Sequence, residues 1–160
     1  AIVAAATQAG KPVVVDAEAP VALAQKALDG ASHVVFSEQG LAEYAGASTG
    51  EALAQVAARL GSWCAVTRGP LPVLCHDGAR LTEIPTLATT ALNTLGAGDV
   101  WHGAFTLALA QGRSEGDAAL WANAAASLKV RRPVHVEDLP RADEVAAALE
   151  HDLKEQELSK

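Results

Sequence analysis

The residues best placed to do chemistry form a short loop at 93–99, with the sequence Asn-Thr-Leu-Gly-Ala-Gly-Asp, which runs into an apolar helical stretch. Its small residues, Gly96, Ala97 and Gly98, allow the backbone to approach a ligand closely. A helix beginning here points its unpaired amide N–H groups and the positive end of its dipole at the same place. The sequence therefore predicts an anion site at this loop.

Asp99 adds a carboxylate beside that site, where a protein that only binds an anion has no use for negative charge. Phosphoryl transfer to an alcohol needs positioned oxygens, stabilisation of negative charge and a base for the hydroxyl proton. We therefore expect Asp99 to be the base, and the amides of Gly96, Ala97, Gly98 and Asp99 to form the anion hole. Thr94 is expected to cap the helix or contact phosphate. The alternative is a simple helix start, in which Asp99 only complements the helix dipole.

The composition sets limits on the class of protein. The chain has 160 residues, half of them hydrophobic, and a formal net charge of −7, which predicts one domain with a full core. Because no basic run or stripe occurs, we expect no nucleic-acid or anionic-membrane partner. No apolar run is as long as a membrane span and no signal peptide is visible, so a cytoplasmic protein is predicted. Cys64 and Cys75 lack Cys-x-x-Cys spacing, which favours two buried, reduced thiols.

The start of the chain suggests a longer protein. The sequence contains no methionine and opens within an expected helix over residues 1–9, ended by Gly10. Removal of an initiator methionine would explain the first observation, but it would not supply the missing start of the helix. We therefore expect the chain to be the C-terminal portion of something longer.

Alternating strands and helices position the loop. Short β-branched runs predict strands at 13–16, 33–36 and 63–67, and Asp77-Gly78 predicts the turn of a hairpin over 73–84. Helices are expected between the first strands, then from the loop to about 111, from 114 to Pro133 and from about 141. This is an α/β order. Ligands of open α/β sheets bind beyond the carboxyl ends of the strands. The residues expected there, in one crevice with the loop, are Asp16, Ser37, Thr67, Arg68 and Gly69.

The loop and the helix after it, residues 93–106, resemble the signature of the ribokinase-like (PfkB) family of carbohydrate kinases. The usual form is Asp-Thr-x-Gly-Ala-Gly-Asp, three further residues, and then a Gly-Ala-hydrophobic step. The Val-Thr-Arg-Gly run at 66–69 resembles the family's strand end near the ATP phosphates, and the alanine-rich run at 121–127 resembles a following helix. By this resemblance the whole chain is similar to the C-terminal half of such a kinase.

The resemblance implies a three-layer α/β/α sandwich with a mostly parallel sheet and a β-hairpin at its edge. It implies transfer of the γ-phosphoryl group of ATP to a sugar hydroxyl, with Asp99 as the base and Mg²⁺ accompanying the nucleotide. Thr67 and Gly69 would lie along ATP with Arg68 and Ser37 near them, and Asn123 would lie near the adenine. The sugar pocket and the lid, which often forms a homodimer contact, would belong to the missing N-terminal half. The 160 residues alone are therefore not expected to turn over.

Several positions depart from the family pattern. Asn93 replaces the usual Asp, and Ser-Glu-Gln-Gly at 37–40 replaces an expected Asn-x-x-Glu, for which Glu38 or Glu43 could substitute. Arg132-Pro133 stands where a glycine is common near a monovalent-cation site, so potassium activation is not predicted. Asn93 and Asp16 are candidates for contact with substrate or metal, with helix capping as the alternative for Asp16. The missing glutamate keeps open a second function, a nucleotide- or anion-binding module without catalysis.

Overall fold

The computed structural model describes residues 2–133 and 139–158, and it divides into two compact units, 1–84 and 85–160. Each unit is described by itself. The secondary structure of the chain follows the predicted α/β order.

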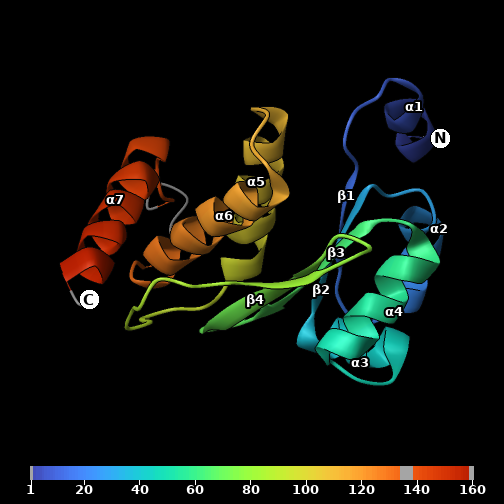
Figure 1. The fold of residues 1–160 in the computed structure, drawn as a ribbon, viewed down its shortest axis with the longest axis horizontal. Helices are drawn as coiled ribbons and strands as arrows, with labels where there is room; N and C mark the ends of the chain where they lie inside the picture. Colours follow the sequence, from blue (N-terminus) through green and yellow to red (C-terminus); the bar gives the residue numbers. More distant parts are fainter. Residues whose placement is uncertain (1, 134–138, 159–160) are drawn as a thin grey trace. The chain divides into compact units, whose positions relative to one another are not determined.

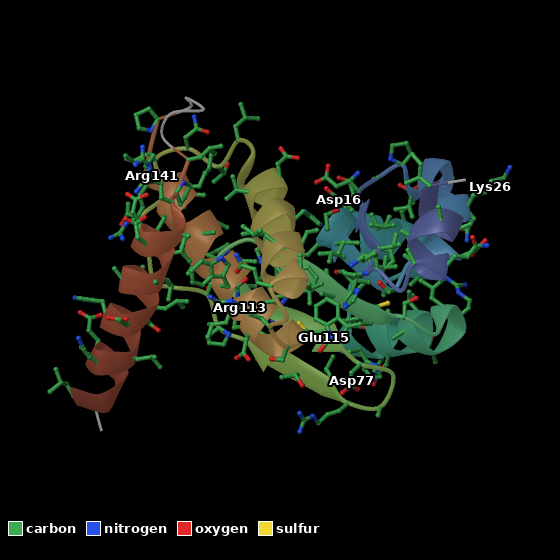
Figure 2. The ribbon with its side chains drawn as sticks, turned by 90° about the horizontal axis from the view of Figure 1, so that it is seen from above. Asp16, Lys26, Asp77, Arg113, Glu115 and Arg141 are labelled. Atoms are coloured by element: carbon green, nitrogen blue, oxygen red, sulfur yellow. The ribbon has the colours of Figure 1, made fainter. Side chains whose placement is uncertain are left out.

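Unit 1 is built on a five-stranded sheet in the order β1-β2-β3-β4-β5 (Figure 1). The strands are β1 (Val14–Ala17), β2 (His33–Ser37), β3 (Trp63–Arg68), β4 (Leu71–His76) and β5 (Leu81–Ile84). The pairs β1–β2 and β2–β3 are parallel, whereas β3–β4 and β4–β5 are antiparallel. The predicted hairpin is confirmed, with Asp77 at its turn accepting hydrogen bonds from the amides of Ala79 and Arg80 (Figure 2). The sheet is mixed, so the prediction of a mostly parallel sheet was only partly right.

Helices alternate with the first three strands of unit 1. They are α1 (Ile2–Gln8), a 3-10 turn (Val21–Ala24) that continues as α2 (Gln25–Leu28), α3 (Glu38–Ala45) and α4 (Gly50–Leu60). Leu41 of α3 and Leu53 of α4 are fully buried in one cluster with Phe36 of β2. Ser37 and Thr49 cap α3 and α4, because their hydroxyl oxygens accept hydrogen bonds from the amides three residues later.

Strand β1 differs from its prediction as a buried strand. Val14 and Val15 are half-buried and Asp16 is exposed. The strand pairs only with β2 in the described sheet, and a strand at a sheet edge has one neighbour rather than two. The apolar run was read correctly as a strand, but its place at the edge reduces its burial.

Unit 2 contains α5 (Ala97–Ala110), α6 (Glu115–Val130) and α7 (Ala142–Leu158) (Figure 1). Helices α5 and α6 pack together, and Trp101 of α5 donates a 2.7 Å hydrogen bond from Nε1 to Oδ1 of Asn123 on α6. The ring of Trp101 also stacks on that of Phe105, with centroids 5.0 Å apart. Ser114 caps α6 at the predicted start of this helix, by accepting from the amide of Asp117.

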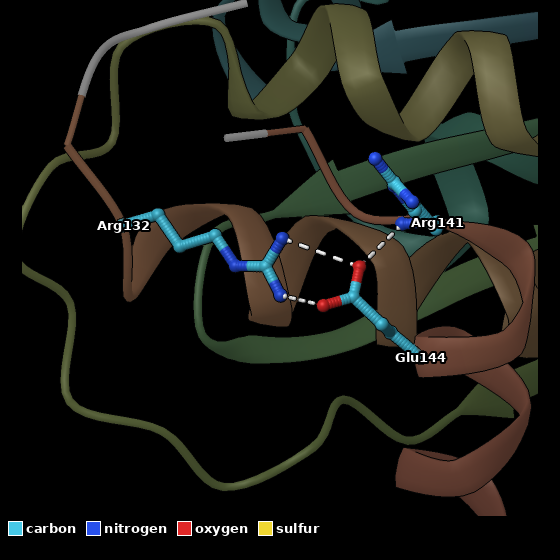
Figure 3. Close-up of polar contacts among 3 residues, drawn as sticks. All are labelled: Arg132, Arg141 and Glu144. Carbon is cyan, nitrogen blue, oxygen red and sulfur yellow. Dashed lines mark hydrogen bonds and ion pairs between the residues drawn. The ribbon is translucent and has the colours of Figure 1, made fainter. Parts of the chain in front are cut away.

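An ion pair joins the end of α6 to the start of α7 (Figure 3). Arg132 donates from Nη2 to Oε1 of Glu144 at 2.6 Å, and the amide of Arg141 donates to Oε2 at 2.7 Å. Glu144 therefore stabilises the first turn of α7 while binding Arg132, the second residue after α6. These bonds lower the pKa of the Glu144 carboxyl below its ordinary value, with the Arg132 hydrogen bond as the main cause.

Both cysteines are buried free thiols, as predicted. Burial raises the pKa of Cys64 and of Cys75 to about 12, so both remain protonated at neutral pH. None of the helices in the described ranges is both long and apolar enough to traverse a bilayer.

Candidate active site

The loop at 93–99 is fastened to the end of α6. The amides of Leu92 and Asn93 both donate to the carbonyl oxygen of Val130, at 2.7 and 3.0 Å. The side chain of Asn93 closes the next turn, because its Oδ1 accepts from the amide of Leu95 at 2.8 Å. Asn93, a candidate for substrate or metal, thus uses this oxygen to shape the loop.

The start of α5 leaves backbone donors open. Gly96 caps the helix with a φ of +72°, a left-handed conformation that favours glycine, and no side chain caps this end. The amide of Ala97 donates to the carbonyl oxygen of Thr94 at 3.1 Å. Among the described residues, no acceptor is found for the amides of Gly96, Gly98 and Asp99. Three of the four predicted anion-hole donors are therefore available, and the amide of Ala97 is used within the loop.

Asp99 stands in the first turn of α5 and is exposed. It borders a cavity of about 570 Å³ whose lining comes from the loop and from helices of unit 2. The lining is mainly apolar, and Asp99 and Lys129 are its charged residues within the described part of the chain. A carboxylate here is close to the positive end of the helix dipole and is accessible to a ligand.

Lys129 is the residue that the sequence analysis missed. Its Nζ donates to the carbonyl oxygen of Asn93 at 3.2 Å and to that of Leu95, although the residue is only 5% exposed. The helical spacing contained a sign of this, because Trp121, Ala125 and Lys129 recur every four residues and all three line the cavity. A lysine on this mainly apolar face of α6 needs hydrogen-bond acceptors close to its ammonium group.

Asn123 on α6 and His102 on α5 both have hydrogen-bond partners within unit 2. Asn123 is 2% exposed, accepts from Trp101, and donates from Nδ2 to the carbonyl oxygen of Pro85 at 2.8 Å. This geometry gives Asn123 a role in joining helices, and its contact with adenine stays a prediction. His102 Nδ1 donates to the carbonyl oxygen of Gly98, four residues earlier in α5, at 2.8 Å.

The strand-end residues of unit 1 lie together at the carboxyl edge of the parallel strands. Ser37 and Thr67 are register partners on β2 and β3. The Thr67 hydroxyl donates to the carbonyl oxygen of Phe36 at 3.3 Å, and Ser37 caps α3. Asp16 is exposed near the end of β1 (Figure 2).

The end of β3 and the turn after it carry the other two nucleotide-binding candidates of unit 1, Arg68 and Gly69. Arg68 donates from Nε to the carbonyl oxygen of Pro72 at 2.8 Å, and its Nη2 lies 3.9 Å from a Glu83 oxygen. Gly69 has a φ of +58° and turns the chain into β4. The guanidinium is therefore held at the hairpin by its neighbours.

Gly40 explains a departure from the expected Asn-x-x-Glu pattern. A Cβ at Gly40 would lie 2.0 Å from the carbonyl oxygen of Ala17, so no side chain fits. Of the two proposed substitutes, Glu43 accepts from the amide of Val21 at 2.9 Å, and Glu38 is exposed in the first turn of α3. The close approach of α3 to β1 thus requires glycine where the carboxylate was expected.

The described residues contain no group of three or more His, Cys, Asp or Glu side chains that could hold a metal ion.

Comparison with known proteins identifies the family. The model of the pfkB family carbohydrate kinases matches residues 1–142. A bifunctional protein HldE from Caulobacter sp. is 34% identical over 142 residues, which are 82% of this chain and 28% of that protein. The ribokinase of Bacillus subtilis is 31% identical over 120 residues, 74% of this chain and 40% of that protein.

Solved structures give the same result for the fold. A candidate ribokinase from Agrobacterium tumefaciens matches with a TM-score of 0.90 and 30% identity, over 96% of this chain and 52% of that one. A ribokinase from Thermotoga maritima matches with a TM-score of 0.78 and 25% identity, over 93% of this chain and 52% of that one. The chain therefore spans less than half the length of these curated relatives and about half of these solved chains. It belongs to the pfkB family of carbohydrate kinases.

Proposed function

We propose that the protein containing this chain is an ATP-dependent carbohydrate kinase that transfers the γ-phosphoryl group of ATP to a sugar hydroxyl. The observation that carries this proposal is the exposed carboxylate of Asp99 in the same helical turn as the open amides of Gly98 and Asp99. Family membership supports the same chemistry.

In the proposed reaction Asp99 accepts the proton of the sugar hydroxyl as its oxygen attacks the γ-phosphorus. A bond forms between this oxygen and phosphorus, the bond from phosphorus to the bridging oxygen breaks, and ADP leaves with that electron pair. The amides of Gly96, Gly98 and Asp99 donate to the migrating phosphoryl group. Fixed donors at the positive end of a helix stabilise the transition state without reorganising during the reaction.

The remaining predicted residues keep supporting roles in this proposal. Thr67, Arg68, Gly69 and Ser37 are proposed to contact the nucleotide, and Thr94 to contact phosphate. Asp16 and Asn93 remain candidates for substrate or metal, and Asn123 for the adenine. Mg²⁺ is proposed to accompany ATP and neutralise its phosphates. Mg²⁺ in such sites binds to phosphate oxygens, water molecules and one or two side chains, for which Asp16 and Asn93 are the candidates in this chain.

The complete protein is proposed to supply what this chain lacks. Ribokinase of Arabidopsis thaliana was crystallised with ribose and ATP, and fructokinase of Vibrio cholerae with fructose and ADP. We propose that this chain is the C-terminal half of a similar three-layer α/β/α kinase of the cytoplasm. Its sugar pocket, and a lid that forms a homodimer contact, would lie in the other half.

The test is an assay of ADP release from ATP and Mg²⁺, using the longest polypeptide that the gene encodes. Ribose, fructose and other pentoses and hexoses are supplied one at a time. Sugar-dependent ADP release, with a phosphorylated sugar as the second product, is the expected result. ATP binding without ADP release for any sugar would contradict the kinase and favour the binding module, a function consistent with the glycine at position 40.

A further inference from the structure

Lys129 is a buried charge inside an otherwise apolar stretch of helix. It lies between Leu128 and Val130 near the end of α6 and is 5% exposed. A buried ammonium group is costly unless acceptors replace its water, and lysine is seldom fully buried without them. Its partners therefore indicate why it is placed there.

Those partners are two backbone carbonyl oxygens of the loop at 93–99, called the glycine loop below. Lys129 Nζ donates to the carbonyl oxygen of Asn93 at 3.2 Å and to that of Leu95. Its neighbour Val130 accepts from the amides of Leu92 and Asn93. Two consecutive residues of α6 thus hold the backbone of the loop just before α5 begins. On the loop's side these bonds involve backbone atoms only, so they fix the path of the loop.

The direction of one peptide links this contact to the anion site. In a trans peptide the N–H points away from the C=O. When the Leu95 carbonyl points at the ammonium, the Gly96 N–H of the same peptide is directed away from it. That amide is one of the three donors without an acceptor in the described part of the chain.

We propose that Lys129 is a positioning residue whose ammonium group acts as a built-in monovalent cation for the glycine loop. Neutral carbonyl oxygens gathered around one point are the ligands that bind a desolvated monovalent cation. Here the chain supplies that cation from its own helix. Its positive charge offsets the repulsion between two carbonyl oxygens that point at the same place. Its hydrogen bonds keep the Gly96 amide directed at the phosphoryl group. The effect on catalysis rests on the proposed kinase function, whereas the cation site does not.

The test removes the ammonium in two ways in the longest polypeptide that the gene encodes. Lys129→Met keeps most of the side-chain volume without charge, and Lys129→Ala leaves room for an external cation. Loss of loop geometry is expected to lower kcat by about 10²-fold in both, since small displacements at a reacting centre have effects of that size. Potassium or ammonium chloride should restore part of kcat in Lys129→Ala but not in Lys129→Met.

Three controls make this result specific. Lithium and choline chlorides at the same ionic strength should restore nothing. The parent protein should respond equally to all four salts. Lys154→Ala, which removes an exposed lysine of α7, should behave like the parent. Full activity of Lys129→Met, or activity of Lys129→Ala that no cation restores, would overturn the proposal.

A second readout separates this proposal from the kinase proposal. The melting temperature of Lys129→Ala should rise in potassium or ammonium chloride relative to choline chloride, and that of the parent should not. If no sugar is phosphorylated but this selective stabilisation is observed, the built-in cation stands and the kinase function fails. If phosphorylation is observed but the melting temperature of Lys129→Ala is the same in all the salts, the kinase proposal is supported and the built-in cation is contradicted.

Discussion

The carboxylate of Asp99 lies close to the backbone of Gly96, because a Cβ built at Gly96 would be 3.7 Å from Asp99 Oδ2. Gly96 also has a φ of +72°, so any other residue would be strained there. A single turn of chain therefore holds both the candidate base and the start of the candidate anion hole. This short distance makes separate tests of the two functions necessary.

Replacing Asp99 with Asn tests the base. The amide is similar in shape but cannot accept the hydroxyl proton, so kcat should fall by about 10²- to 10⁴-fold or more. The affinity for ATP should change little, because the backbone donors remain. Turnover is measured by ADP release and ATP binding by calorimetry. Activity within a few-fold of the parent would remove Asp99 from the role of base.

The matched control is Asp117→Asn on α6. Gly96 caps α5 and Ser114 caps α6, so Asp99 and Asp117 are both the third residue after their caps. Each substitution removes a favourable charge–dipole interaction of about 0.3–1 kcal/mol. Asp117 also accepts a hydrogen bond from the Ser114 hydroxyl at 2.6 Å, so Asp117→Asn should lose at least as much stability as Asp99→Asn. Only Asp99→Asn should lose turnover.

Replacing Gly98 with Ala tests the anion hole. A Cβ at Gly98 meets no atom of the protein within 4 Å, and its φ is not left-handed. Alanine should therefore be tolerated and could stabilise the helix by about 0.5–1 kcal/mol. Because Cβ atoms tilt toward the N-terminus of a helix, the methyl group would enter the space in front of the open amides. We expect kcat/KM for ATP to fall by about tenfold or more, a loss of roughly 1.4 kcal/mol in transition-state binding.

Gly116→Ala controls for the change in helix propensity. Gly116 is the second residue of α6, as Gly98 is of α5, and its Cβ would also meet open space. Melting temperatures should change in the same direction in both variants. Steady-state kinetics should distinguish them, and equal kinetics for both would place the phosphate elsewhere.

Much of this structure could be predicted because its determinants are local in sequence. Ser114 precedes a helix, Asp77-Gly78 marks a hairpin, and the glycine loop precedes α5. Each of these features depends on hydrogen bonds or backbone conformations within a few residues. Sequence spacing alone is sufficient for such features.

The features that were missed depend on distant contacts. Val14 belongs to a strand, as predicted, but its burial depends on which strands pair with β1. Gly40 reads as an ordinary helix residue until the carbonyl oxygen of Ala17 is placed against it. The position of Lys129 near a helix end is typical of a solvated charge, but in the structure its Nζ donates to two carbonyl oxygens of the loop. These partners lie 19 to 36 positions away, and local spacing in a single sequence does not identify them.

Gly40→Ala tests the close packing of α3 on β1. A Cβ 2.0 Å from a backbone oxygen forces the backbone to move, and overpacking of this kind costs about 1–3 kcal/mol or more. The free energy of unfolding in urea should fall by that amount. Gln39→Ala, an exposed change in the same helix, should leave it within about 0.5 kcal/mol of the parent. Parent-like stability of Gly40→Ala would show that α3 can move away from β1.

Acid should weaken the connection between α6 and α7 through Glu144. Hydrogen bonds from Arg132 and from the amide of Arg141 lower the pKa of this carboxyl in the folded protein. A lowered folded pKa means that the carboxylate contributes stability above its unfolded pKa. That contribution is lost as the pH falls through the folded pKa. The loss should therefore begin near pH 4.3, the ordinary value for glutamate, and continue below it, roughly as for other paired carboxylates.

The measurement compares urea unfolding of the parent and of Glu144→Gln from pH 8 to pH 3. The parent should be the more stable of the two by a constant margin above about pH 6, and this margin should shrink below about pH 4.3. Glu150→Gln, which removes an exposed carboxylate further along α7, is measured beside it as the control for loss of one negative charge from this helix. A margin for Glu144→Gln that is equal at pH 3 and pH 7 would mean that its ionised form is not what joins the two helices.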